Sequence, residues 1–183
     1  MSQIAAMRVG NYLIGFQDFL NFLEEFSDLK NSTVVEIGSY AGESTIMFAQ
    51  RAKAVIAIDP FVNDYDLNDG TCFAADLPTT VYQRFLENIS PYNNITHIQK
   101  TSDDAVADLA GQQFDVVYID GVHTYEQVKK DIENYRGLVK PGGFLCGHDY
   151  GNVGHIAGVY RAVNEAFGKP DVTFIDMTWV IRF

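Results

Sequence analysis

The stretch TVVEIGSYAGES, residues 33–44, is the most informative part of the chain about its architecture, because it joins a strand to a helix through a glycine turn. Residues 33–37 predict a strand, and residues 43–52 predict a helix. Between them, Gly38 and Gly42 let the backbone turn sharply and let a ligand approach closely. The stretch therefore predicts the first strand, turn and helix of an α/β fold.

The same alternation continues along the chain. Further apolar strands are expected at residues 54–58, 95–99, 114–119 and 143–146, and further helices at 77–89, 103–109, 125–135 and 155–167. Strands that are apolar on both faces and separated by helices indicate a parallel sheet covered on both sides, a doubly wound three-layer sandwich. Two final strand-like runs, 172–175 and 179–183, are too close for a crossover helix and predict an antiparallel hairpin.

We expect residues 1–183 to form one domain, because the length suits a single core. Residues 1–30 predict a helical extension, with a helix at 15–29 whose apolar stripe could pack on the core or on a second subunit. The stripe consists of Phe16, Phe19, Leu20, Leu23 and Phe26, and its aromatic character suggests a homodimer. Residues 60–76 are a long non-periodic stretch rich in Asp and Asn, which predicts a lid loop.

Composition and charge argue against several classes of function and location. A net charge of -11 argues against nucleic acid as the main partner. The chain has no apolar run near the ~20 residues that cross a bilayer, and its first residues do not form a clear signal peptide. Cys72 and Cys146 lack metal-ligand spacing, so they are expected to be free thiols in a reducing cytoplasm.

Acidic residues close several of the expected strands. Ligands of open parallel sheets bind beyond the carboxyl ends of the strands. The strand ends carry Glu36, Asp59, Asp120 and Asp149. The glycine turn does not match the dinucleotide pattern G-x-G-x-x-G, and Glu43 would repel a pyrophosphate. Asp59 lies at the end of the second expected strand, where a carboxylate typically accepts hydrogen bonds from the hydroxyls of a ribose. A cationic nucleoside without phosphates therefore fits this edge better than NAD.

Four motifs in this order carry a family resemblance: EIGSYAG (36–42), VIAIDP (55–60), FDVVYIDGVHTY (114–125) and LVKPGGFLCGHDY (138–150). Together they resemble the class I S-adenosylmethionine-dependent methyltransferases, most closely the methyltransferase domain 24 type related to macrocin O-methyltransferase. The resemblance covers roughly residues 30–183. It implies a seven-stranded Rossmann-like sheet of order 3-2-1-4-5-7-6, with strand 7 antiparallel.

The resemblance also implies a cofactor site for S-adenosylmethionine. Its methionine end would lie along Glu36, Gly38, Ser39 and Gly42, with Asp120 in the same set. The ribose would lie at Asp59, and the adenine beside Pro60, Phe61, Thr101, Ser102 and Asp103. Alternatively, residues 101–103 simply cap the next helix, since Ser and Asp favour that position.

In metal-dependent relatives, an Asp after the fourth strand and two polar residues after the fifth bind a divalent cation. The corresponding residues are Asp120, His148 and Asp149, for magnesium, manganese or another cation; an imidazole suits manganese, iron or zinc better than magnesium. Alternatively, His148 is a general base and no metal binds. His123 is the other candidate base, with a pKa expected near the working pH, unless it is only a residue at a helix start.

These residues predict a methyltransferase that acts on an oxygen of a small hydroxylated acceptor, such as a sugar or secondary metabolite, with catalysis by His123, His148 and Asp120. The alternatives are a non-catalytic binding module of the same fold and, more weakly, an NAD-dependent oxidoreductase, which the missing glycine opposes.

Overall fold

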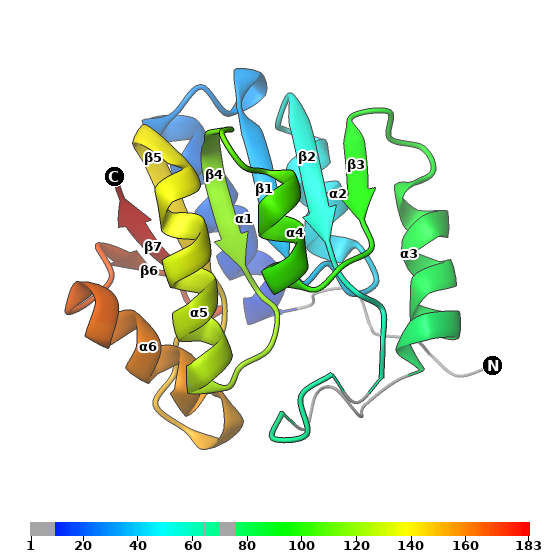
Figure 1. Cartoon of the computed structure of the whole chain (residues 1–183). Coiled ribbons are helices and arrows are strands. Elements are labelled where there is room, and N and C mark those ends of the chain that lie inside the picture. The colour runs from blue at the N-terminus through cyan, green and yellow to red at the C-terminus, as the bar shows by residue number, and fades with distance from the viewer. Residues whose placement is uncertain (1–9, 64, 70–75) are drawn as a thin grey trace.

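The computed structural model describes residues 10–63, 65–69 and 76–183. Its centre is a seven-stranded sheet (Figure 1) of order β3-β2-β1-β4-β5-β7-β6. The strands are β1 (Thr33–Ile37), β2 (Ala54–Ile58), β3 (Ile95–Ile98), β4 (Phe114–Ile119), β5 (Val139–Gly147), β6 (Val172–Thr173) and β7 (Trp179–Arg182). Pairing is parallel from β3 to β5, whereas β7 is antiparallel to both of its neighbours. The predicted strand order and the antiparallel final hairpin are therefore confirmed.

Helices cover both faces of the sheet, which confirms the three-layer sandwich (Figure 1). One face carries α4 (Ser102–Asp108), α5 (Tyr125–Tyr135) and α6 (Ala157–Phe167); the other carries α1 (Asn11–Phe26), α2 (Glu43–Ala49) and α3 (Tyr82–Ile89). Short helical turns complete the chain: η1 (Leu29–Asn31), η3 (Leu77–Val81), η4 (Arg136–Leu138) and η5 (Gly154–Ile156).

The strand side chains alternate between the two layers, as a strand's period of two requires. In β4, Val117 and Ile119 face the α5 side, whereas Val116 and Tyr118 face the α1 side. All of them are buried, because helices lie on both faces. Because β1, β2, β4 and β5 run parallel to one another, their carboxyl ends lie at the same edge of the sheet.

Helix α1 packs on the core of its own chain. Phe16, Phe19, Leu20 and Leu23 are fully buried, and the rings of Phe19 and Tyr118 stack with centroids 5.6 Å apart. Phe26, expected on the same stripe, is 47% exposed, because the helix ends there and the chain turns toward β1. The helix also begins at Asn11, before the expected start at residue 15. The buried part of the stripe thus packs on the sheet of its own chain, and the homodimer stays a prediction.

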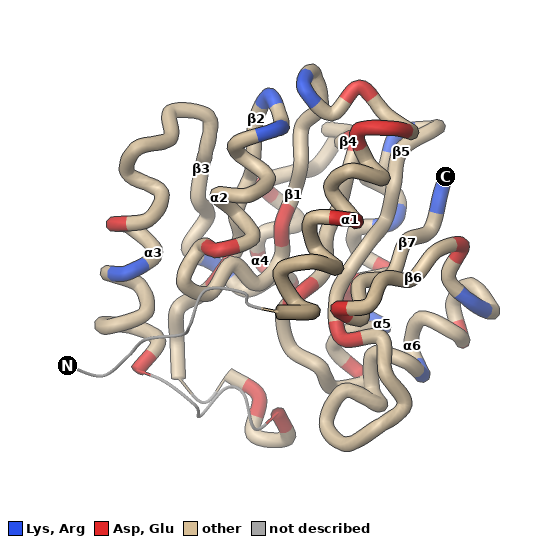
Figure 2. Tube along the Cα trace, turned by 180° about the vertical axis from the view of Figure 1, so that it is seen from behind, with Lys and Arg blue, Asp and Glu red and all other residues tan. Residues whose placement is uncertain are grey.

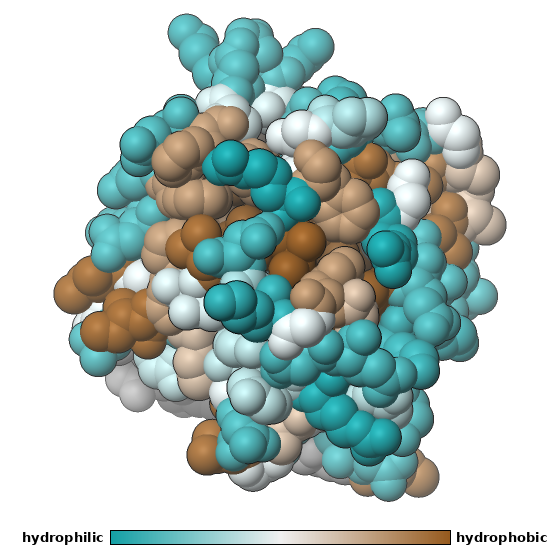
Figure 3. All heavy atoms as spheres, turned by 90° about the vertical axis from the view of Figure 1, so that its left-hand side faces the viewer, coloured by the Kyte–Doolittle hydropathy of each residue, from teal (hydrophilic) through white to brown (hydrophobic). Residues whose placement is uncertain are grey.

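Two strands differ in length from expectation. β5 begins at Val139 because Val139 pairs with Phe114 before a bulge in the ladder, whereas β6 comprises only Val172 and Thr173. This short edge strand lies on the side of the molecule that Figure 3 shows, where apolar residues are interspersed among polar ones. Among the described residues, no helix is both long and apolar enough to cross a membrane.

Candidate active site

Gly38 brings the ends of β1 and β4 into contact. Its φ is +86°, a region that other residues rarely adopt, and a Cβ there would lie 2.1 Å from the carbonyl oxygen of Asp120 and 2.6 Å from the Cα of Gly121. No side chain fits in that space. The glycine turn therefore sets the predicted cofactor edge directly against the predicted metal and catalytic edge.

Buried polar groups line the glycine turn. Glu36 is fully buried on the α2 side of β1, where its Oε2 accepts a hydrogen bond from Thr45 Oγ1. Ser39 is buried as well, and its Oγ has no hydrogen-bond partner among the described residues. A buried hydroxyl without a partner is unfavourable unless a ligand or water satisfies it. Gly42, with φ +82°, ends the turn as the N-cap of α2.

Asp59 organises the backbone at the end of β2. Its carboxylate accepts the amide of Tyr40 at 2.9 Å and that of Phe61 at 2.8 Å. Both donors have positive φ, 45° and 50°, which is strained for residues other than glycine and is found mostly at functional sites. Burial raises the pKa of the Asp59 carboxyl above its ordinary value, and the amides only partly offset this. A carboxylate has about four acceptor positions, so Asp59 retains capacity for ribose hydroxyls.

The structure does not place the Phe61 ring at the open edge. The ring is 1% exposed and packs against Tyr82 and Phe85, with centroids 4.7 and 5.0 Å away. The Phe61 ring thus belongs to the core under α3. Its backbone amide is the group that contacts the edge of the sheet, through the hydrogen bond to Asp59. Pro60 is half-buried beside it.

Residues 101–103 do cap α4, as the alternative interpretation predicted. Thr101 is the N-cap residue, and its Oγ1 accepts the amide of Asp104 at 3.2 Å. Ser102 is buried, and its Oγ accepts a hydrogen bond from Gln127. Asp103 forms an ion pair with Lys130 at 2.6 Å. The side chains therefore have structural roles, and a contact with adenine stays a prediction.

A second group of residues lies at the ends of β4 and β5. Asp120, His123 and Asp149 each offer one ligand atom, and these atoms lie within 4.8 Å of one another. His123 Nε2 is 2.8 Å from Asp149 Oδ2. Asp149 itself has φ +59°, another strained backbone position. Two carboxylates and one imidazole are a donor set that suits a divalent cation such as manganese or zinc. We refer to these three residues as the carboxylate–imidazole group.

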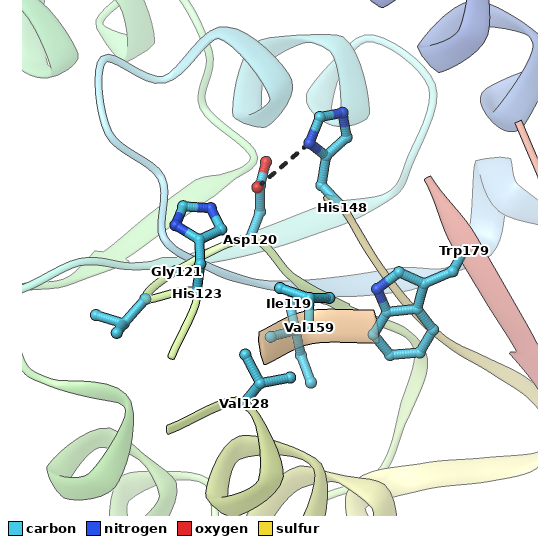
Figure 4. Close-up of a pocket in the computed structure, with 9 residues that line it drawn as sticks. Ile119, Asp120, Gly121, His123, Val128, His148, Val159 and Trp179 are labelled. Atoms are coloured by element: carbon cyan, nitrogen blue, oxygen red, sulfur yellow. Dashed lines mark ion pairs between the residues drawn. The ribbon is translucent and has the colours of Figure 1, made fainter. Parts of the chain in front are cut away.

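The two histidines flank Asp120 above a small pocket (Figure 4). His148 Nδ1 lies 3.2 Å from Asp149 Oδ2 and 3.8 Å from Asp120 Oδ1. Its Nε2 faces the other way, 3.8 Å from the buried Asp176. The apolar floor of the pocket is formed by Ile119, Val128, Val159 and Trp179. The candidate metal cluster of the structure therefore contains His123 where the sequence predicted His148.

The expectation of a near-neutral pKa for His123 is wrong. Burial by itself would lower the pKa of the imidazole, but its hydrogen bonds with Asp149 and Asp69 raise it to about 10. The raised pKa favours the protonated ring, which disfavours His123 as the general base. Conversely, the histidines hold the pKa of Asp149 below its usual range, although burial acts in the opposite direction. His123 is also half-buried rather than an exposed residue at a helix start.

The expected lid loop is described only in part, because residues 64 and 70–75 lie outside the described residues; Cys72 is among these. The described segment 65–69 lies against the ends of β4 and α5. Asp66 Oδ2 accepts a hydrogen bond from Thr124 Oγ1 at 2.9 Å. Asp69 Oδ2 accepts from His123 N at 2.7 Å and pairs with His123 Nδ1 at 2.9 Å.

Sequence reasoning missed three acidic residues of this region: Asp66, Asp69 and Asp176. The Asp-rich composition of residues 60–76 was the one available signal for the first two. Nothing in the spacing connects Asp69 with His123, which is 54 positions away. Asp176 lies in the final hairpin, where an Asp is ordinary turn chemistry.

The edge as a whole is acidic. Figure 2 shows red segments on the loops below β1 and β4. Glu36, Asp59, Asp120 and Asp149 all lie at this edge. Lys53 and Lys140, in contrast, stand at the starts of β2 and β5, at the opposite edge. Clustered carboxylates favour a positively charged ligand.

A seven-stranded sheet of this order, with a glycine turn after β1 and acidic strand ends, defines the architecture of class I methyltransferases. Residues 35–150, more than half of the chain, match the methyltransferase domain family. The chain belongs to this family, which confirms the methyltransferase domain 24 type; the likeness to macrocin O-methyltransferase stays a prediction.

Sequence comparison also finds curated relatives of this chain. An uncharacterized protein of Acanthamoeba polyphaga mimivirus is 30% identical over 139 residues, 73% of this chain and 58% of that protein. The chain spans between 16% and 58% of the length of the curated relatives that it matches.

Two solved structures share the fold. A candidate caffeoyl-CoA O-methyltransferase from Staphylococcus aureus has a TM-score of 0.65 and 16% identity, covering 92% of this chain and 82% of its own. The N-methyltransferase NodS from Bradyrhizobium japonicum, in complex with S-adenosyl-L-homocysteine, has a TM-score of 0.52 and 18% identity, covering 72% and 58%.

Proposed function

We propose that this protein transfers the methyl group of S-adenosylmethionine to an oxygen of a small hydroxylated acceptor, such as a sugar or secondary metabolite, with the help of a divalent cation. Membership of the methyltransferase family supports the cofactor. The observation that carries the proposal is the contact between the ends of β1 and β4 at Gly38, which places the glycine turn beside the carboxylate–imidazole group.

The residues of the glycine turn fit the cofactor. S-adenosylmethionine supplies a methyl group on a positively charged sulfur. Glu36 and Asp120 give the edge negative charge. The buried Ser39 hydroxyl, which has no partner within the described part of the chain, is a group that a ligand would satisfy. Asp59 would hold the ribose hydroxyls, from a carboxylate that two strained backbone amides keep in place. Pro60 would border the adenine.

The carboxylate–imidazole group would hold the cation. A bound cation lowers the pKa of an acceptor hydroxyl and orients its oxygen, which matters because a neutral alcohol is a weak nucleophile. Asp120, Asp149 and Nε2 of His123 would provide the ligand atoms, and the cation would displace the proton from Nε2 on binding. His148 would then be the base, with Nδ1 toward the acceptor and Nε2 toward Asp176. Asp176, 3.8 Å from Nε2, would attract the protonated ring electrostatically without a hydrogen bond at that distance.

Calorimetry with S-adenosylhomocysteine tests the cofactor site. Asp59→Ala removes two charge-assisted hydrogen bonds to the ribose, so we expect affinity to fall about 10- to 100-fold. The matched control is Asp108→Ala, which removes a carboxylate from an exposed ion pair with Lys100. Wild-type protein that binds no S-adenosylhomocysteine, or equal affinity in both variants, would contradict the assignment.

Calorimetry with Mn²⁺ tests the cation site. Asp120→Asn and Asp149→Asn should each weaken binding at least tenfold, because each loses a charged ligand, whereas Asp108→Asn should bind as the wild type does. A non-catalytic module of the same fold is the rival proposal. It would bind S-adenosylhomocysteine equally well, yet show no methyl transfer to any sugar or hydroxylated metabolite in a screen with Mn²⁺ present.

A further inference from the structure

Asp69 is a buried carboxylate at the edge of the carboxylate–imidazole group. It is 1% exposed, although it belongs to the long loop between β2 and η3. One oxygen, Oδ2, accepts the backbone amide of His123 at 2.7 Å and faces its ring Nδ1 at 2.9 Å. Two contacts from one oxygen to one residue constrain the backbone and the ring of His123 together.

This contact determines what the other side of the ring does. Which histidine nitrogen faces a ligand is set by the hydrogen bond that the other nitrogen makes. With Nδ1 directed at Asp69, Nε2 points to Asp149, 2.8 Å away, and into the carboxylate–imidazole group. Without Asp69 the ring would lose its Nδ1 partner, and the contact with Asp149 would hold Nε2 in this position less firmly.

We propose that Asp69 is a positioning residue, which holds the imidazole of His123 in place between Asp120 and Asp149. The inference rests on the proposed function for the role of that group in methyl transfer. It makes the described segment 65–69 part of the site, because the orientation of His123 depends on Asp69.

The neighbouring Asp66 provides a matched control. It holds the same turn: its backbone carbonyl accepts the amide of Asp69 at 3.2 Å, and its side chain binds Thr124. It therefore anchors the loop to the residue that follows His123 without reaching the imidazole. If Asp69 were only a loop anchor, Asp66→Ala and Asp69→Ala would have the same effect.

The ring itself is the first readout. The chain has four histidines, so ¹⁵N-histidine labelling gives few ring signals, and His123→Gln identifies the one in question. We expect a protected Nδ1–H signal of His123 in the wild type and in Asp66→Ala, and its loss in Asp69→Ala. Asp69→Asn should retain it, because the amide oxygen still accepts both hydrogen bonds.

The affinity for Mn²⁺ is the second readout. Loss of the partner that orients a ligating histidine typically costs about 10- to 100-fold in metal affinity. We expect this loss in Asp69→Ala, a change of a few-fold in Asp69→Asn, and wild-type affinity in Asp66→Ala. Unchanged binding of S-adenosylhomocysteine in every variant would show that the fold is intact.

The outcomes separate this inference from the proposed function. If the Nδ1–H signal persists in Asp69→Ala, or disappears equally in Asp66→Ala, the positioning role is overturned. Loss of the signal with unchanged Mn²⁺ affinity also overturns it. If the wild type binds no Mn²⁺, the cation part of the proposed function fails, and the ring signal alone then decides the role of Asp69.

Discussion

Replacing Gly38 with alanine tests the contact on which the site depends. The substitution forces a residue with a Cβ into φ +86°, which costs about 1–2 kcal/mol. The new Cβ would also lie 2.1 Å from the backbone oxygen of Asp120, and overpacking of this kind costs about 1–3 kcal/mol. We therefore expect Gly38→Ala to lower the free energy of unfolding by about 2–5 kcal/mol.

Two other glycines separate these contributions. Gly111 has φ +77° with nothing within 4 Å of its Cβ position, so Gly111→Ala should lose only the conformational part, about 1–2 kcal/mol. Gly137 has neither constraint, and Gly137→Ala should change stability by less than about 1 kcal/mol. Urea denaturation of the three variants, at equal slope, measures these differences.

Binding completes the test of Gly38. Because the new Cβ pushes the ends of β1 and β4 apart, Gly38→Ala should also weaken S-adenosylhomocysteine binding at temperatures where the variant is folded, whereas Gly111→Ala should not. If Gly38→Ala loses no more stability than Gly111→Ala and binds the ligand normally, the close approach of the two strands is not what forms the site.

Other predictions concern the core and a buried carboxyl. Burial raises the pKa of Asp131 from 3.8 to about 6, and the side chain is 1% exposed. The folded protein thus binds more protons than the unfolded chain between these values, so this group's contribution to stability is fully present below pH ~4 and is lost as pH rises from about 4 through about 6, a decline of about 3 kcal/mol. Asp131→Asn should remove that decline in urea titrations at pH 4 and pH 8; an equal decline in the variant would assign it to other groups. Phe19→Ala should cost about 3–5 kcal/mol in thermal unfolding, because the ring is fully buried. Phe26→Ala, at 47% exposure, should cost less than about 1 kcal/mol; similar losses in both variants would mean that α1 does not pack as described.

Much of the fold was predictable because the relevant patterns are local. Apolar runs such as residues 114–119 are buried on both faces, and this indicates a parallel sheet between helices. The three residues between β7 and the run that ends at Ile175 leave no room for a crossover helix. The end of α1 was less predictable: Phe26 fits the helical period, yet the chain leaves the helix at that point and exposes its ring.

The candidate site was predictable only in outline. Strand ends place Asp120 and Asp149 at one edge, so their proximity followed from topology. The choice between His123 and His148 did not, because it depends on the directions in which loop side chains point. The pKa of His123 likewise depends on Asp69, a residue far away in the sequence.

Local patterns in the amino acids were enough to predict the succession of strands and helices, the glycine turn after β1 and the acidic edge, because these follow from periodicity and from the carboxyl ends of parallel strands. The folded arrangement was needed to show that Phe61 joins the core, that His123 belongs to the carboxylate–imidazole group, and that Asp69 faces the His123 ring. The reason is physical: loop contacts form between residues distant in sequence, and no local pattern encodes which side chains meet when the chain closes on itself.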